Sequence, residues 1–168
     1  MRDHSRLFAA VALTALATSC GKNDGETGTA AEQAVFPTAA TLGQQTVKTA
    51  AEYLATEPYV DADRTRGERQ AQLCKACHSL DEGGPNMVGP ALYGFFGREV
   101  GAGEGFEYSA VMRNADFVWT PEAVNAWLAQ PGRFLPGNRM TFAGVPEQDD
   151  RNELIAYLLE ETTSGSGE

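Results

Sequence analysis

Apolar side chains near the C-terminus recur at the spacing of an α-helix. Leu154, Tyr157 and Leu158 stand at positions i, i+3 and i+4, so they share one helical face. Pro146 precedes this stripe, and proline is favoured in the first turn of a helix because its missing N–H has no partner there. The pattern therefore predicts a C-terminal helix that begins near Pro146.

A second helix is predicted to start at Thr120-Pro121, where a capping hydroxyl is followed by proline at the first helical position. Val124, Trp127 and Leu128 lie on one face of this helix. Pro131 should end it, because proline cannot continue a helical hydrogen-bond ladder.

Two further segments have helical composition. Residues 64–73 lack proline, and Gly67 would let another backbone come close. Residues 109–115 can form a short helix with Ser109 as its N-cap. Between them, residues 80–105 hold eight glycines and two prolines, so little regular structure is expected there. No strand pattern competes, and the predicted fold class is all-α with long loops.

The N-terminus has the pattern of an export signal. Basic residues precede a short apolar run over 7–17, and small residues follow it. We predict a signal peptide over 1–19, which places the mature protein on the periplasmic side of a bacterial membrane. Cys20 lies in a sequence that resembles a lipoprotein box, so we expect a lipid anchor there. The leucine usual three places before the cysteine is one place early, at Leu16, and a plain signal-peptidase cut that gives a soluble protein stays open.

Residues 20–61 are rich in Gly, Ala, Thr and Gln and hold few large apolar side chains. Such a segment buries too little to offset its ordering entropy, so we predict a flexible tether, with a short helix within 42–54 as the alternative. The composition changes after Asp61. We place the folded domain at 62–162 and a disordered tail at 163–168.

The formal net charge of −10 limits the kinds of partner that the protein can bind. Nucleic-acid binding needs a basic face, which this chain lacks. We therefore expect protein partners and no nucleic acid.

The sequence Cys74-Lys75-Ala76-Cys77-His78 has the C-x-x-C-H spacing of covalent haem attachment. One helical turn sets the two thiols at about the separation of two porphyrin vinyl groups, and the next residue can offer an imidazole nitrogen to the iron. A structural zinc site would need four ligands, and only His4 and Cys20 remain, both in the export region. A thioredoxin-like pair would need an α/β pattern around it. We predict one covalent haem c.

The second axial ligand decides what such a haem can do. After the export region His78 is the only histidine, which leaves three methionines. Met87 and Met112 are interpreted as core-filling side chains. Met140 follows the turn Pro136-Gly137 and lies 62 residues after His78, far enough to reach the opposite face. The residues alone do not decide whether Met140 is a ligand or part of the core.

From about residue 67 to residue 161 the chain resembles a class I c-type cytochrome, close to the mitochondrial and bacterial c2 type. The likeness does not cover the signal or the tether. It rests on Cys74-Lys75-Ala76-Cys77-His78, Val88-Gly89-Pro90-Ala91-Leu92, Gly94-Phe95-Phe96-Gly97-Arg98, Gly105-Phe106-Glu107-Tyr108-Ser109, Trp119, Pro136-Gly137 with Met140 and Phe142, and Leu154-Ile155-Ala156-Tyr157-Leu158.

The resemblance implies a fold of helices and glycine-rich loops wrapped around one covalent haem. It implies that Cys74 and Cys77 bind the haem, that His78 and Met140 are its axial ligands, and that the Pro90 carbonyl accepts the other N–H of His78.

The same resemblance implies that Arg98, Tyr108 and Trp119 hydrogen-bond the haem propionates, since a buried carboxylate is costly unless it is paired. The residues alone would favour a surface arginine and two core aromatics.

Three features depart from the family. Gln70 and Ala71 stand where an aromatic is usual, so the contact between the terminal helices should be smaller. Trp127 stands where a tyrosine usually contacts the methionine sulfur. Met112 replaces a common polar residue near the haem.

These expectations describe a one-electron carrier with a low-spin His/Met haem and no small-molecule substrate. It would shuttle electrons between respiratory or photosynthetic membrane complexes, as a donor to a terminal oxidase, and would not be an enzyme. The alternative is a haem peroxidase, nitrite reductase or gas sensor with a labile sixth ligand. Lys75, Arg133 and Arg139 flank the two ligand segments, so the surface there should be less negative than the rest.

Overall fold

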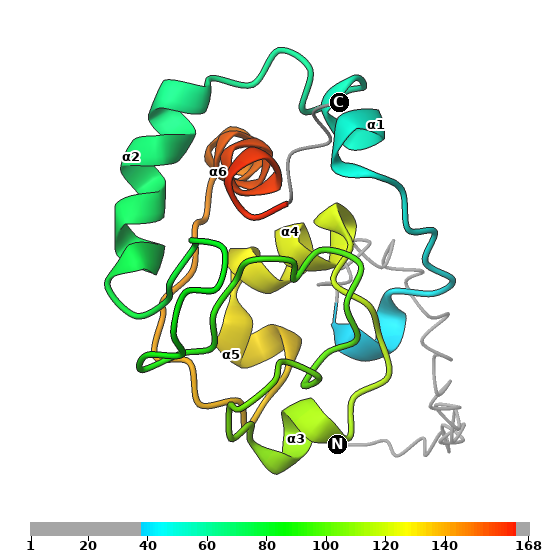
Figure 1. Cartoon of the computed structure of the whole chain (residues 1–168). Coiled ribbons are helices and arrows are strands. Elements are labelled where there is room, and N and C mark those ends of the chain that lie inside the picture. The colour runs from blue at the N-terminus through cyan, green and yellow to red at the C-terminus, as the bar shows by residue number, and fades with distance from the viewer. Residues whose placement is uncertain (1–37, 164–168) are drawn as a thin grey trace, which may run out of the picture. The chain divides into compact units, whose positions relative to one another are not determined.

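The computed structural model describes residues 38–163, and the loops that follow α2 lie below α6 in the view of Figure 1. In chain order they are the 3-10 helix η1 Ala39–Thr41, α1 Ala50–Leu54, α2 Arg64–Lys75, α3 Ala110–Arg113, α4 Pro121–Ala129, α5 Pro131–Phe134 and α6 Gln148–Glu161. Within the described residues the only β-pairing is one isolated bridge between Glu99 and Val118, so the predicted all-α class is confirmed. Of the helices in this part of the chain, none is long and apolar enough to cross a membrane.

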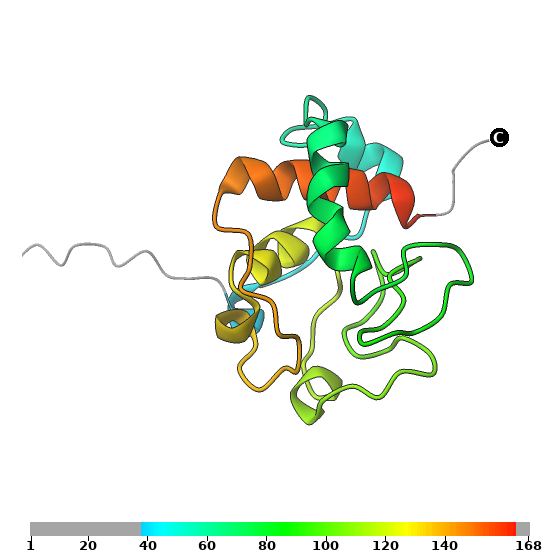
Figure 2. The same ribbon diagram turned by 90° about the vertical axis from the view of Figure 1, so that its left-hand side faces the viewer.

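Helices α2 and α6 cross each other at close range (Figure 2). Gly67 lies at the crossing, where a Cβ atom would come 2.2 Å from the Glu153 carbonyl oxygen and 2.8 Å from the Tyr157 Cβ. Ala71, one turn further along α2, is fully buried. The close backbone approach predicted at Gly67 is therefore confirmed, and it depends on small residues along α2.

Polar contacts surround this crossing. Arg66 pairs with Asp150 at 2.5 Å and with Glu153 at 3.2 Å, although the arginine is half exposed and such pairs add little stability. Gln70 donates from Nε2 to Glu153 at 3.3 Å, while its buried Oε1 has no hydrogen-bond partner among the described residues. The position that is usually aromatic in the family thus adds a polar contact to α6.

Local signals start and end the helices much as the sequence predicts. The Thr120 hydroxyl accepts from the Ala123 N–H at 3.3 Å and caps α4. The chain leaves α4 before Pro131, which then opens the single turn α5. Ser109 precedes α3, but its hydroxyl makes no capping hydrogen bond. Glu147, one residue after Pro146, is the N-cap of α6.

The structure differs from the predicted tether over residues 38–61. Tyr53 and Tyr59 are each only 5% exposed and belong to the hydrophobic core. The Arg64 guanidinium donates to the Tyr59 carbonyl at 2.9 Å, which fastens the end of the segment to α2. Two large aromatic side chains bury enough surface to order a segment that is otherwise poor in apolar residues. Residues 1–37, which include the predicted signal peptide, Cys20 and the first part of the tether, lie outside the described residues, as do residues 164–168.

Segment 38–54 and α2 lie on opposite sides of the folded unit, with α6 and α4 between them (Figure 1). The folded domain therefore begins well before residue 62.

Candidate functional site

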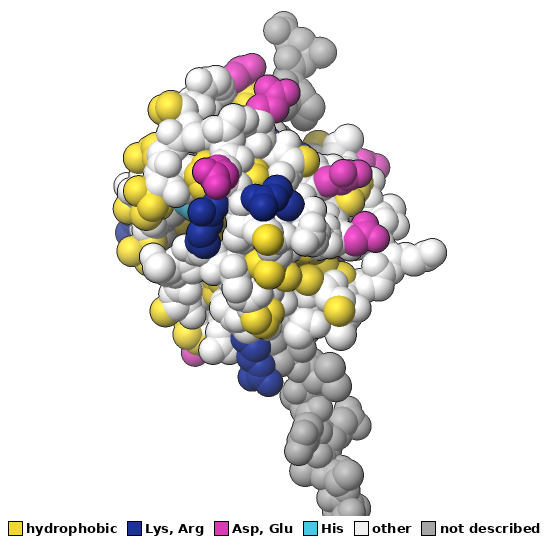
Figure 3. Space-filling model, turned by 90° about the horizontal axis from the view of Figure 1, so that it is seen from below, with side chains coloured by type: hydrophobic (Ala, Val, Ile, Leu, Met, Phe, Trp, Pro, Cys, Tyr) yellow, Lys and Arg dark blue, Asp and Glu magenta, His cyan; other side chains and the backbone are white. Residues whose placement is uncertain are grey.

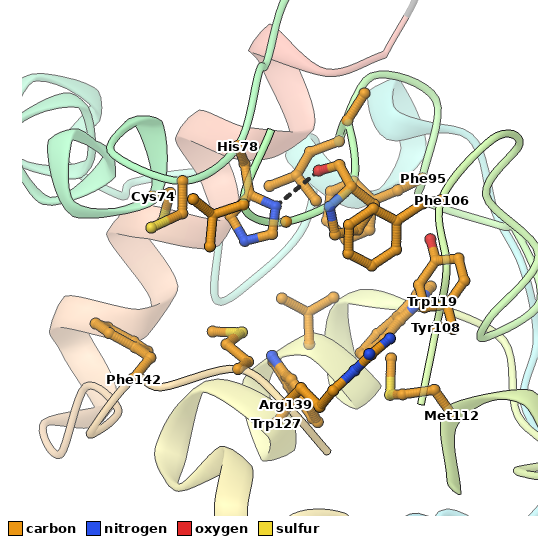
Figure 4. A pocket seen from close by; sticks show the side chains of 18 of the residues that line it. Cys74, His78, Phe95, Phe106, Tyr108, Met112, Trp119, Trp127, Arg139 and Phe142 are labelled. Carbon is orange, nitrogen blue, oxygen red and sulfur yellow. Dashed lines mark hydrogen bonds between the residues drawn. The ribbon is translucent and has the colours of Figure 1, made fainter. Parts of the chain in front are cut away.

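A cavity of about 530 Å³ lies between the end of α2, the glycine-rich loops, α4 and the loop that precedes α6 (Figure 4). Apolar side chains form most of its wall. All eight cofactor-binding residues expected from the sequence line it: Cys74, Cys77, His78, Pro90, Arg98, Tyr108, Trp119 and Met140.

The end of α2 sets the first wall. The N–H groups of Cys77 and His78 both donate to the Cys74 carbonyl, at 3.0 and 2.9 Å. This turn brings two free thiols and an imidazole to the same edge of the cavity. Burial raises the pKa of the Cys74 thiol to about 11, so it stays protonated at neutral pH.

The orientation of His78 is fixed by the loop that follows. Its Nδ1 lies 2.7 Å from the Pro90 carbonyl oxygen, and because a carbonyl only accepts, Nδ1 carries the proton. Burial lowers the pKa of His78, and the Pro90 carbonyl opposes this shift less strongly. The ring is therefore neutral, and its Nε2 lone pair is available to a metal.

Gly89 is packed against this imidazole. A Cβ atom there would come 2.3 Å from the His78 Cε1, so only glycine leaves room for the ring. The Gly89 N–H also donates to the Cys77 carbonyl at 2.9 Å. The loop thus holds His78 from two directions.

The wall across from His78 comes from the loop between α5 and α6. Arg139 and Phe142, on either side of Met140 in the sequence, lie across the cavity from His78 (Figure 4). Asn138 fixes the turn, since its amide donates to the Leu135 carbonyl at 2.8 Å and its Oδ1 accepts from the Met140 N–H at 2.9 Å. Sequence reasoning missed Asn138; the only signal was an amide side chain directly after Pro136-Gly137.

Polar side chains gather at one end of the cavity. Backbone hydrogen bonds of 3.0 Å join the Trp119 N–H to the Arg98 carbonyl and the Gly97 N–H to the Trp119 carbonyl. Tyr108 is close enough to Arg98 for the guanidinium to lower its pKa, although burial is the larger effect and raises it. This end therefore offers hydrogen-bond donors and positive charge to an acidic group.

Aromatic rings close the remaining side. Trp127 is only 7% exposed and meets Trp119 edge to face, with ring centroids 5.5 Å apart. Phe134 packs on Trp127 at 5.9 Å, also edge to face. Such contacts make a rigid, dry wall.

This arrangement fits haem c. Two thiols stand beside a neutral imidazole, a thioether side chain comes from another loop, the lining is apolar, and the donors gather where propionates could be bound. The zinc alternative has no support in this part of the chain, because no group of three His, Cys, Asp or Glu residues is placed to hold a metal ion among residues 38–163.

Comparisons with known proteins agree with this chemistry. The chain is 45% identical over 94 residues to a cytochrome c homolog of Bradyrhizobium diazoefficiens, 55% of this chain and 51% of that protein. It is 38% identical over 109 residues to cytochrome c2 of Blastochloris viridis, 65% of this chain and 86% of that protein. It is 38% identical over 102 residues to cytochrome c2 of Agrobacterium tumefaciens, 59% of this chain and 92% of that protein.

The chain therefore matches about half the length of the Bradyrhizobium protein and most of the two c2 proteins. No family-level sequence profile matches it.

Proposed function

Since this chain belongs to the class I c-type cytochromes and is an electron carrier with one covalent haem c, we propose that it shuttles single electrons between membrane complexes. In this proposal His78 and Met140 are the two axial ligands of the iron and keep it low-spin. One observation supports this proposal more strongly than any other. The neutral His78 ring presents Nε2 to the cavity because the Pro90 carbonyl holds Nδ1, and Met140 lines the same cavity from a different loop.

When bound, haem c supplies an iron that exchanges one electron between its ferrous and ferric states. Cys74 and Cys77 would hold the cofactor as thioethers. The Pro90 carbonyl makes His78 a better donor by drawing on its Nδ1–H, and it also keeps the ring from rotating. If His78 and Met140 both held the iron, it would have no place for a substrate, which favours electron transfer over catalysis.

The chain's own residues would also stabilise the propionates. Arg98, Tyr108 and Trp119 bring charge and hydrogen-bond donors to one end of an apolar cavity, where an unpaired carboxylate would be costly. The aromatic wall would keep water from a bound haem. A dry, fixed surrounding should limit rearrangement when the charge of the iron changes.

The proposal also includes the cellular location of the protein and its electron donor and acceptor. The export signal over 1–19 favours the periplasmic side of a bacterial membrane, and Cys20 is proposed to carry a lipid; both lie outside the described residues. The partners would be redox proteins, with a quinol-oxidising complex as donor and a terminal oxidase as acceptor. Mass spectrometry of the mature N-terminus tests the anchor: an unmodified terminus upstream of Cys20 would contradict it.

Docking should involve the surface around the ligand loops. On the lower side of the molecule, Lys and Arg side chains stand beside hydrophobic ones, with Asp and Glu side chains also on this face (Figure 3). Lys75 donates to the Tyr157 hydroxyl at 3.0 Å, and Arg139 donates to the Glu107 carbonyl, so both cations are held in place. Fixed positive charges on an acidic protein should steer an acidic partner toward this surface.

The charge reversal Arg133→Glu tests this steering. We expect it to slow electron transfer to the acceptor severalfold at low salt and to flatten the salt dependence of the rate, since screening then has less attraction to remove. Stopped-flow kinetics over a range of ionic strength measures both. Arg69→Glu, the same charge change on the exposed side of α2, is the control and should have the smaller effect. If the electron-transfer rate depends on salt equally in Arg133→Glu and in the unmodified protein, the proposal that this surface steers the partner is rejected.

Carbon monoxide is the reagent that tests the proposed function itself, because it binds ferrous haem only where an axial position is open or easily opened. Inertness supports the shuttle, whereas binding would favour the peroxidase or sensor alternative.

A further inference from the structure

Gln45 makes an unusual contact with a backbone segment 73 residues away. Its Nε2 donates to the Val118 carbonyl at 2.7 Å, and its Oε1 accepts from the Val118 N–H at 2.8 Å. One side-chain amide thus pairs with both backbone groups of a single residue, and the Val118 carbonyl also accepts from the Thr120 N–H at 2.8 Å. The same Nε2 also approaches the hydroxyl of Thr120, the N-cap of α4, at 3.3 Å.

Val118 belongs to a short backbone ladder. Residues 97–100 and 117–119 exchange hydrogen bonds of 3.0 Å through the Trp119 N–H, the Val100 N–H and the Gly97 N–H. In such pairing alternate residues direct their N–H and C=O groups away from the partner strand. Gln45 therefore stands where the next strand of a sheet would be, on the open edge of this ladder.

The ladder carries two residues of the haem cavity. Arg98 and Trp119 are directly hydrogen-bonded to each other through their backbones, and both side chains line the cavity. Val118, which Gln45 holds, is the residue next to Trp119. A displacement of Val118 would therefore be passed to the proposed propionate donors through one peptide bond.

Gln45 is itself held in place. The Tyr53 hydroxyl donates to the Thr46 carbonyl at 2.8 Å, and the buried Tyr53 ring fixes that side of the segment in the core. Val47 packs against the ladder, because a Cβ atom on Gly97 would come 3.1 Å from its Cγ1. The amide therefore acts from a fixed segment rather than from a free one.

We propose that Gln45 is a positioning residue that holds Trp119 and Arg98 toward the haem propionates and so raises the reduction potential of the haem. The part about the propionates rests on the function proposed above. Without the amide, water can reach the edge of the ladder and the two donors are less firmly held. Both changes leave more negative charge uncompensated near the iron, which favours the ferric state.

The substitution Gln45→Met tests this, because methionine keeps the length of the side chain and removes both hydrogen bonds. We expect the Val118 amide of the intact holoprotein to exchange with solvent roughly tenfold faster. We also expect a lower midpoint potential, with the ferric-to-ferrous ratio at fixed ambient potential raised by about twofold to fivefold. Gln44→Met, the same change at an exposed neighbour with no hydrogen bond to the described residues, should leave both readouts at the unmodified values.

Gln45→Glu provides a second check. It keeps an acceptor for the Val118 N–H but sets a negative charge against the Val118 carbonyl, so exchange should again be faster than in the unmodified protein and the midpoint potential should again be lower. Faster exchange with an unchanged potential would show that Gln45 only stabilises the segment, and the positioning role would be rejected; unchanged exchange would reject the contact as well. Carbon monoxide binding by the unmodified protein would overturn the axial ligation without altering either Gln45 readout, so the two failures are distinguishable.

Discussion

The substitution Met140→Ala will leave one axial position of the haem iron open. The alanine methyl group cannot reach the iron, and no histidine other than His78 is present among the described residues to replace the thioether. We expect the ferrous variant to become high-spin, with carbon monoxide occupancy rising from none to one per haem. The midpoint potential should also fall, because methionine ligation raises it. Visible spectra of the reduced variant with and without the gas measure the main effect.

Met112→Ala is the matched control for this experiment. Met112 lines the same cavity from α3 and is the other methionine in its wall, whereas Met87 is half exposed and does not reach the cavity. The Met112 variant should therefore keep the low-spin spectrum and exclude the gas. If carbon monoxide binds the Met112 variant and not the Met140 variant, the ligand assignment has been made to the wrong residue.

The substitution Gly67→Ala will lower the free energy of unfolding by roughly 2–3 kcal/mol, in the range seen for overpacked sites. In an exposed helix the same change would be stabilising by about 0.5–1 kcal/mol, because glycine loses more backbone entropy on folding. Here the new methyl group would meet the Glu153 carbonyl at 2.2 Å and the Tyr157 Cβ at 2.8 Å, and neither is a flexible side-chain tip. Helices α2 and α6 must then move apart.

Denaturant unfolding of the holoprotein, followed by circular dichroism, measures this loss. Gly132→Ala is its control, because Gly132 is also helical and a Cβ atom there would meet nothing within 4 Å. That variant should be as stable as the unmodified protein or slightly more so. A Gly67→Ala protein that gains stability alongside it would show that the crossing has room for a side chain.

The helices could be predicted because their signals are local. The stripe that includes Leu154 and Leu158 gives α6, and Thr120-Pro121 gives the start of α4. The single turn α5 is not predicted, since Pro131 in the sequence indicates only the end of α4. Its four residues are too few to show a periodic pattern.

Apart from α1, which agrees with the short helix given as the alternative within 42–54, the order of the segment over 38–61 could not be predicted, for a different reason. Its average composition is that of a tether, and its order depends on Tyr53, Tyr59 and Gln45. These three residues act through contacts with distant parts of the chain, and nothing near them in the sequence identifies the partners. Two buried tyrosines are too small a fraction of the segment to change its composition.

The residues of the site also fall into those with a local sequence signal and those without one. The spacing of Cys74, Cys77 and His78 carries its chemistry within five residues, so the attachment site could be proposed from the sequence alone. Arg98 and Trp119 look like ordinary surface and core residues, and only the resemblance to a family pointed to them. The structure brings them to one end of the cavity through a ladder, in which the two residues are 21 positions apart in the sequence.

The visible spectrum of the matured, reduced protein, recorded before and after addition of carbon monoxide, tests the central claim most directly. If His78 and Met140 both bind the iron, the spectrum is that of a low-spin ferrous haem c, and the gas leaves it unchanged. A shift of the spectrum on addition of the gas would show that the position assigned to Met140 is open, and would contradict the account of this protein as a pure electron carrier.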